Sequence, residues 1–115
     1  MEPQQRVLVL GATGYVGGRL VPELLDAGFA VRCLTRTPQG LSGTAWAADV
    51  EVVEGDLSEL SSVGAAFDDV DHVVYLVHSL GVGDDFMQHE QQTAHNARMA
   101  AERSGVGHIV YVGGL

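Results

Sequence analysis

Short aliphatic runs alternate with longer stretches of mixed polarity along this chain. Each run is apolar at consecutive positions, which is typical of strands that are covered on both faces of a parallel sheet. The pattern predicts five strands, at residues 6–10, 30–34, 50–54, 70–76 and 108–112.

The stretch after the first run has the spacing of an amphipathic helix. Its apolar face repeats from Val16 to Leu24, and the helix should end near Gly28. Pro22 lies inside it, where a missing donor and a clash with the carbonyl of Gly18 normally cost about 3 kcal/mol. We expect a local kink at this point and not the end of the helix.

Two more helices are predicted on the carboxyl side of the third run. Leu60, Val63 and Phe67 would form the buried stripe of the first, and the second would extend from residues 84–85 to Ser104, with Gly105 as its stop. Strands and helices in alternation predict an α/β fold. We expect a doubly wound parallel sheet of the Rossmann type with strand order 3-2-1-4-5.

Three glycines follow the first strand at three-residue spacing: Gly11, Gly14 and Gly17. The first would let the chain turn sharply, the second would admit a pyrophosphate to bare backbone, and the third would let the helix pack close to the strand. Free N–H groups at the start of the helix attract phosphate. The pattern predicts a dinucleotide site; a purely structural glycine turn is the alternative.

The residue after the second strand predicts which dinucleotide is preferred. NAD-specific sites usually place an Asp or Glu about 20 residues after the glycine motif, to accept from the ribose 2′-hydroxyl. No acid stands there, and Arg36 does. A guanidinium can bind a 2′-phosphate with charge-assisted bonds, which predicts a preference for NADP(H) over NAD(H). A solvated arginine is the alternative.

The same residues carry a family resemblance. The stretch 11–17 resembles the GxxGxxG fingerprint of extended and atypical short-chain dehydrogenase/reductases, and stretches 55–57, 75–79 and 109–115 resemble the NmrA-like, NAD(P)H-binding branch. The resemblance implies that the cofactor contacts lie at Gly11, Thr13, Gly14, Tyr15, Val16, Gly17, Asp56, Leu57, Leu76, Val77 and His78. Asp56 and Leu57 would lie beside the adenine, although Asp56 could equally cap a turn.

The resemblance does not extend to a catalytic set. The better-known enzymes of this superfamily use a Tyr-x-x-x-Lys pair and a Ser or Thr, but this chain has no lysine, and Gly113 and Gly114 stand where the hydroxyl would be. His78 and Ser79 are the polar side chains with a claim on a substrate, yet nothing around them supplies a nucleophile and its base. The catalytic residues therefore stay unassigned.

Three functions remain open. The chain could be the NADP(H)-binding domain of an atypical reductase or epimerase-like oxidoreductase, a non-catalytic NADP(H) sensor, or a fragment without independent function. Proteins of the resembled family usually continue beyond this length, so residues 1–115 are expected to form one Rossmann domain that is incomplete after strand five. A domain of this kind should expose the outer edge of that strand to self-association or to a partner.

Charge and composition exclude several classes of partner. The net charge is −9, which repels nucleic acids and anionic membranes. The amino terminus lacks the pattern of a signal peptide and no apolar run approaches the length of a membrane span, so we expect a cytoplasmic protein. The histidines show no metal-ligand spacing. The single cysteine, Cys33, lies in a predicted buried strand, which indicates packing.

Overall fold

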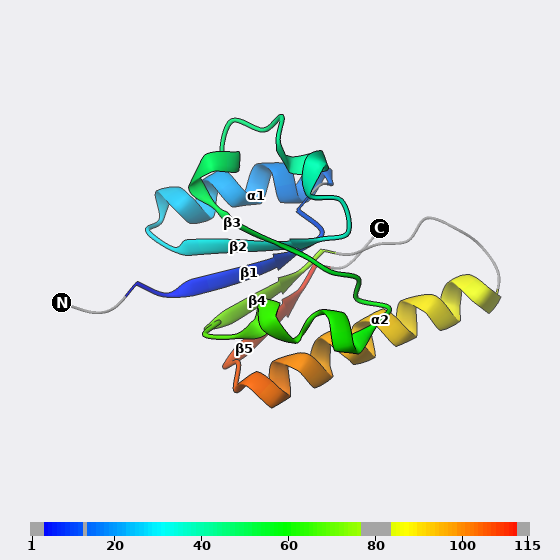
Figure 1. Cartoon of the computed structure of the whole chain (residues 1–115). Helices are drawn as coiled ribbons and strands as arrows, with labels where there is room; N and C mark the ends of the chain where they lie inside the picture. Colours follow the sequence, from blue (N-terminus) through cyan, green and yellow to red (C-terminus); the bar gives the residue numbers. More distant parts are fainter. Residues whose placement is uncertain (1–3, 13, 77–83, 113–115) are drawn as a thin grey trace.

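A single parallel sheet forms the centre of the molecule (Figure 1). The structure is a computed structural model that describes residues 4–12, 14–76 and 84–112. The strand order is β3-β2-β1-β4-β5, as the sequence predicts. The strands are β1 (Arg6–Leu10), β2 (Ala30–Thr35), β3 (Glu51–Glu54), β4 (His72–Tyr75) and β5 (His108–Tyr111). Their ends lie within two residues of the predicted ones, which is the usual uncertainty of strand boundaries.

Two helices cover the two faces of this sheet. Helix α1 (Tyr15–Asp26) lies on one face and helix α2 (Asp84–Ser104) on the other, which is the doubly wound arrangement (Figure 1). Helix α1 continues through Pro22, as predicted. Gly105 follows α2 with a φ of +73°, the left-handed conformation that ends helices and that glycine adopts without strain.

Each face of the sheet has its own hydrophobic core. Alternate residues of the strands point to opposite faces. One set packs with α1 and the two 3-10 turns η1 (Pro38–Leu41) and η2 (Ala47–Asp49), and buries Trp46 and Cys33. The other set packs with the small-residue face of α2, which contributes Ala97, Ala100 and Ala101.

The segment before β4 is not the helix that the sequence predicts. It forms two 3-10 turns, η3 (Leu60–Ser62) and η4 (Gly64–Phe67). The hydroxyl of Ser62 donates to the carbonyls of Asp56 and Glu59 at 3.0 and 2.8 Å, so a side chain competes for the backbone that a helix would use. The interval of three residues from Leu60 to Val63 suits a 3-10 turn as well as an α-helix, and Val63 and Phe67 are still fully buried.

One charged residue of the central sheet is buried. Arg32 lies in the middle of β2, where its Nη1 donates to the carbonyl oxygens of Ala66 and Asp68 at 2.9 and 2.7 Å. Its Nε and Nη2 both lie 3.3 Å from Oε2 of Glu51. The guanidinium therefore links β2 to η4 and to Glu51, the first residue of β3. These contacts lie toward the amino ends of the strands.

Candidate functional site

The chain leaves β1 through a turn that only glycine fits. Gly11 has a φ of +99°, and a Cβ there would lie 2.9 Å from the carbonyl carbon of Leu76. The amide of Leu76 in turn donates to the carbonyl of Leu10 at 2.7 Å. The ends of β1 and β4 are thus held close together, so the turn opens at the carboxyl edge of the sheet, where ligands bind in doubly wound folds.

Gly14 faces open space. Its backbone is extended, with φ −81° and ψ 177°, so the position does not need glycine for its conformation. Among the residues that the structure describes, a Cβ there would meet only the carbonyl oxygen of Gly11, at an ordinary 3.6 Å. The missing side chain therefore leaves room in front of the turn, which is where a pyrophosphate would lie.

Helix α1 begins directly behind this space without a cap of its own. Its N-cap residue is Gly14, which has no side chain to bond the first N–H groups, and no acidic residue lies in the first turn. The positive end of the helix dipole is thus left without a counter-charge from these residues. The uncapped end and the open space together fit an anionic ligand.

Gly17 has a packing role. A Cβ at this position would lie 2.5 Å from the Cα of Ala12, a distance that real atoms do not tolerate. The glycine thus brings the first turn of α1 against the backbone that leaves β1. The three glycines of the motif thus have three different roles in the structure. Gly11 forms the turn, Gly14 leaves space in front of it, and Gly17 allows close packing.

Arg36 lies at the exposed end of β2. The amide of Thr37 donates to Oγ1 of Thr35 at 3.1 Å, and this bond shapes the turn that carries the arginine. Among the described residues, Arg36 has no hydrogen bond or ion pair. Its guanidinium remains available to an anion at the carboxyl edge.

Asp56 occupies the corresponding place after β3, and one of its two oxygens is committed. Oδ1 accepts from the backbone N–H of Ser58 at 2.9 Å and from its hydroxyl at 2.8 Å. These two bonds, together with the charges of Arg36 and His89, hold the pKa of the Asp56 carboxyl below its usual value. Asp56 therefore caps a turn, as one of its two predicted roles requires, while Oδ2 makes no hydrogen bond within the described residues.

Helix α2 holds the backbone next to Asp56 in place. The side-chain Nδ2 of Asn96 donates to the carbonyl oxygen of Leu57 at 2.7 Å in a buried bond. Leu57 itself is part of the core on the α2 face. The family resemblance gives Asn96 a structural role near the loop after the fourth strand, but its bond to Leu57, 39 residues away, was not predicted.

The remaining predicted site residues divide into two groups. Tyr15 and Val16 are exposed at the start of α1, and the guanidinium of Arg19 stacks over the Tyr15 ring at 4.6 Å from its centroid. The exposure of Val16 contradicts its predicted place in the buried stripe of the helix. Predictions for Thr13, Val77 and His78 concern residues outside the part of the chain that the structure describes.

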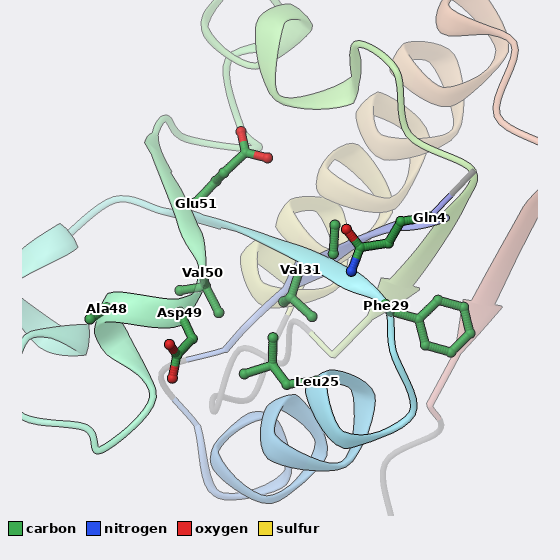
Figure 2. Close-up of a pocket in the computed structure, with 9 residues that line it drawn as sticks. Gln4, Leu25, Phe29, Val31, Ala48, Asp49, Val50 and Glu51 are labelled. Carbon is green, nitrogen blue, oxygen red and sulfur yellow. The ribbon is translucent and has the colours of Figure 1, made fainter. Parts of the chain in front are cut away.

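A separate hollow lies at the other end of the sheet (Figure 2). It has a volume of about 530 Å³ and lies between the end of α1 and the first residues of β2 and β3. Its lining includes the apolar side chains of Leu25, Phe29 and Val31, with the acids Asp49 and Glu51 at its side. This charge makes the hollow a poorer candidate for an anionic ligand than the glycine turn at the carboxyl edge.

Two negative findings concern the described residues. No three His, Cys, Asp or Glu side chains among them gather into a group that could hold a metal ion. None of their helices is long and apolar enough to cross a membrane.

Comparison with known proteins finds relatives that are named as dehydrogenases or reductases. The chain is 34% identical to the 3 beta-hydroxysteroid dehydrogenase/Delta 5→4-isomerase of Mycobacterium tuberculosis, over 92% of this chain and 30% of the relative. It is 36% identical to the (4-alkanoyl-5-oxo-2,5-dihydrofuran-3-yl)methyl phosphate reductase of Streptomyces griseus, over 90% of this chain and 33% of the relative. The chain thus spans about a third of the length of these curated relatives.

Solved structures share the fold. The triphenylmethane reductase of Citrobacter sp., solved with NADP(H), superposes with a TM-score of 0.75 at 28% identity. The match covers 94% of this chain and 37% of the reductase. A family model described as NAD(P)H-binding matches residues 11–115, which begin at the first glycine of the turn. The chain therefore belongs to the NAD(P)H-binding family and forms a Rossmann-type dinucleotide-binding domain related to reductases and dehydrogenases.

Proposed function

We propose that this domain binds NADP(H) in preference to NAD(H), as the cofactor-binding part of an oxidoreductase of the short-chain dehydrogenase/reductase type. The observation that carries the proposal is Arg36. It lies at the end of β2, exposed and without a hydrogen bond or ion pair among the described residues. No acid occupies its turn to accept from a free 2′-hydroxyl.

The residues at the carboxyl edge fit the parts of the cofactor in order. The uncapped start of α1 and the space in front of Gly14 would hold the pyrophosphate. Arg36 would bind the 2′-phosphate, and the unoccupied Oδ2 of Asp56 would accept from the adenine amino group. Leu76, together with Val77 and His78 of the sequence, would line the ribose and nicotinamide half.

When bound, the nicotinamide would supply hydride transfer, which is the chemistry of the cofactor itself. The described residues would bind and orient it. The Mycobacterium and Streptomyces relatives are named as a dehydrogenase and a reductase, which supports redox chemistry for the protein as a whole. We assign neither substrate binding nor proton donation to a residue of this chain.

Calorimetric titration with NADPH and NADH tests the cofactor preference. We expect NADPH to bind more tightly, and Arg36→Ala to remove most of the difference, because one lost charge-assisted pair weakens binding by roughly tenfold or more. Arg103→Ala is a matched control, since Arg103 is exposed near the end of α2, away from the turn. Equal affinity of the unaltered protein for both nucleotides would contradict the preference.

A substitution at Gly14 tests the place of the pyrophosphate. Gly14→Val should abolish nucleotide binding while the fold is kept, because the backbone at this position is ordinary and a Cβ meets no atom of the described residues closer than 3.6 Å. Gly18→Val is the matched control: that glycine lies in the same helix and a Cβ there also has no neighbour within 4 Å. Circular dichroism establishes folding, and a folded Gly14→Val protein with full affinity would show that the turn is only structural.

A further inference from the structure

We propose that Asn96 is a positioning residue of the dinucleotide site, and that it holds the carboxylate of Asp56 in the orientation that selects adenine over hypoxanthine. The inference rests on the proposed function, in which Oδ2 of Asp56 accepts from the adenine amino group. A continuous series of hydrogen bonds that leads from α2 to this carboxylate carries it.

One peptide group connects Asn96 with Asp56. It joins Leu57 to Ser58, and both of its polar atoms are bonded. Its carbonyl oxygen accepts from Nδ2 of Asn96 at 2.7 Å, and its N–H donates to Oδ1 of Asp56 at 2.9 Å. Because a peptide group is planar and rigid, a bond that fixes its carbonyl also fixes the direction of its N–H. The bond from α2 therefore determines where Asp56 meets its donor.

The orientation of the Asn96 amide is determined as well. Asn96 is 3% exposed, so its polar atoms are withdrawn from water. Nε2 of Gln92, one turn earlier on α2, donates to Oδ1 of Asn96 at 2.9 Å. An amide side chain has one oxygen that accepts and one nitrogen that donates. With Oδ1 bonded to Gln92, the nitrogen is the atom that faces the carbonyl of Leu57.

This bond is the external support of the turn after β3. In the described part of the chain, the other hydrogen bonds of residues 56–59 join these residues to one another or to Ser62. Bonds of that kind fix the shape of the turn but not its place in the molecule. The bond from Asn96 comes from another element, and Figure 1 shows the segment after β3 passing beside α2. Asn96 thus places the turn relative to the sheet and the helix.

The placement matters because the free oxygen of Asp56 has a direction. Oδ1 accepts two bonds from Ser58, which leaves Oδ2 without a hydrogen bond among the described residues. An ionised carboxylate can only accept. Adenine would offer it an amino group, whereas hypoxanthine has a carbonyl oxygen at the same position, so that two acceptors would face each other. A carboxylate that is held in place rejects hypoxanthine, and one that can turn away does not.

Thr93 supplies a matched control on the same helix. It is also 3% exposed and comes three residues before Asn96. Its Oγ1 lies 3.0 Å from the hydroxyl of Tyr75 in β4 and donates to the carbonyl of Glu90 at 3.1 Å. Thr93→Val therefore removes a buried bond of α2 that does not lead to Asp56. A general loss of stability would appear in this variant too.

The experiment measures the dissociation constants of NADPH and of deamino-NADPH, in which hypoxanthine replaces adenine. The unaltered chain should bind NADPH more tightly by about tenfold or more. Asn96→Ala should reduce this ratio by about fivefold or more, and Thr93→Val should keep it even if its Tm falls. Gln92→Leu, at an exposed position, removes the bond that orients the Asn96 amide and should lower the ratio in the same direction. It decides the matter if circular dichroism shows that Asn96→Ala does not fold.

The outcomes separate this inference from the proposed function. A folded Asn96→Ala protein with the ratio of the unaltered chain would overturn the role of Asn96 and leave the cofactor assignment standing. An equal loss of the ratio in Thr93→Val would overturn it too, since any weakening of α2 would then suffice. If the unaltered chain binds both compounds equally, the contact of Asp56 with adenine fails and this inference fails with it, while the comparison of NADPH with NADH still tests Arg36.

Discussion

At the residue scale, the three glycines of the turn are chemically identical and structurally unlike. Gly11 needs its positive φ, Gly17 needs the absence of a Cβ, and Gly14 needs neither for the fold. Sequence spacing predicts all three positions, because the turn, the phosphate and the helix contact recur together in such folds. It cannot show which of them the fold requires, since that depends on atoms of Leu76 and Ala12 brought near by folding.

The first prediction concerns Gly17. Gly17→Ala should lower the free energy of unfolding by about 1–3 kcal/mol, because the new Cβ would overlap the backbone of Ala12 at 2.5 Å. Gly18→Ala, one residue further along α1, should instead raise stability by roughly 0.5–1 kcal/mol, since its Cβ would have no atom of the described residues within 4 Å. Urea denaturation measures both. Equal stabilities of the two variants would contradict the packing role of Gly17.

The second prediction concerns the thiol of Cys33. Burial raises its pKa from 9.0 to about 12, so almost no thiolate forms at pH 8 in the folded protein. A thiol reagent such as iodoacetamide should leave the native chain unmodified and label it fully in 6 M urea. Mass spectrometry of the two samples decides the matter, and rapid labelling of the native chain would show that the thiol is accessible.

At the element scale, continuous aliphatic runs predict the strands well. The helical spacing of apolar residues predicts the region before β4 poorly. A strand in a central sheet is determined by its own hydrophobicity. Residues 60–67 are instead determined by contacts with distant parts of the chain: the hydroxyl of Ser62 holds the turn after β3, and Arg32 binds the carbonyls of Ala66 and Asp68. An arginine in an apolar run gives no sequence signal of such partners, and its role was not predicted.

The third prediction tests this connection between β2 and η4. Arg32→Met keeps an unbranched side chain in the core but leaves two carbonyls without their donor, so stability should fall by about 1–3 kcal/mol. Arg19→Met on exposed α1 is the control and should change stability by less than about 0.5 kcal/mol. Thermal unfolding followed by circular dichroism gives both values. An Arg32→Met protein as stable as the control would show that the buried bonds contribute nothing.

At the scale of the whole molecule, all strands of the sheet run in the same direction, so the carboxyl ends of the strands differ from their amino ends. The ends of β1, β2 and β3 carry the glycine turn, Arg36 and Asp56 to one side, while the buried arginine and the second hollow lie on the other. The outer strand β5 is much less covered than its apolar sequence suggests, with Val110 and Tyr111 each 52% exposed. Sequence reasoning predicted this strand and its place in the sheet, and no strand of the described residues pairs with its outer side.

The fourth prediction is that this exposed strand causes association of the 115-residue chain. An apolar edge without lysine or proline is a template for pairing with another strand. The apparent mass measured by light scattering should rise with concentration, and Val110→Lys should suppress the rise. Val52→Lys, on the opposite edge strand β3, is the matched control because Val52 is also exposed, at 39%. A chain that stays monomeric at high concentration would rule out association through β5.

The place of the cofactor can be measured directly by a two-dimensional amide NMR titration of the chain with NADPH. If the dinucleotide binds at the carboxyl edge, the largest shift changes should appear at Gly11, Gly14, Arg36 and Asp56, because these residues surround the proposed ligand. The amides around the hollow in Figure 2, such as Val31, should hardly change. Shifts concentrated around that hollow, with the glycine turn unaffected, would contradict binding at the carboxyl edge.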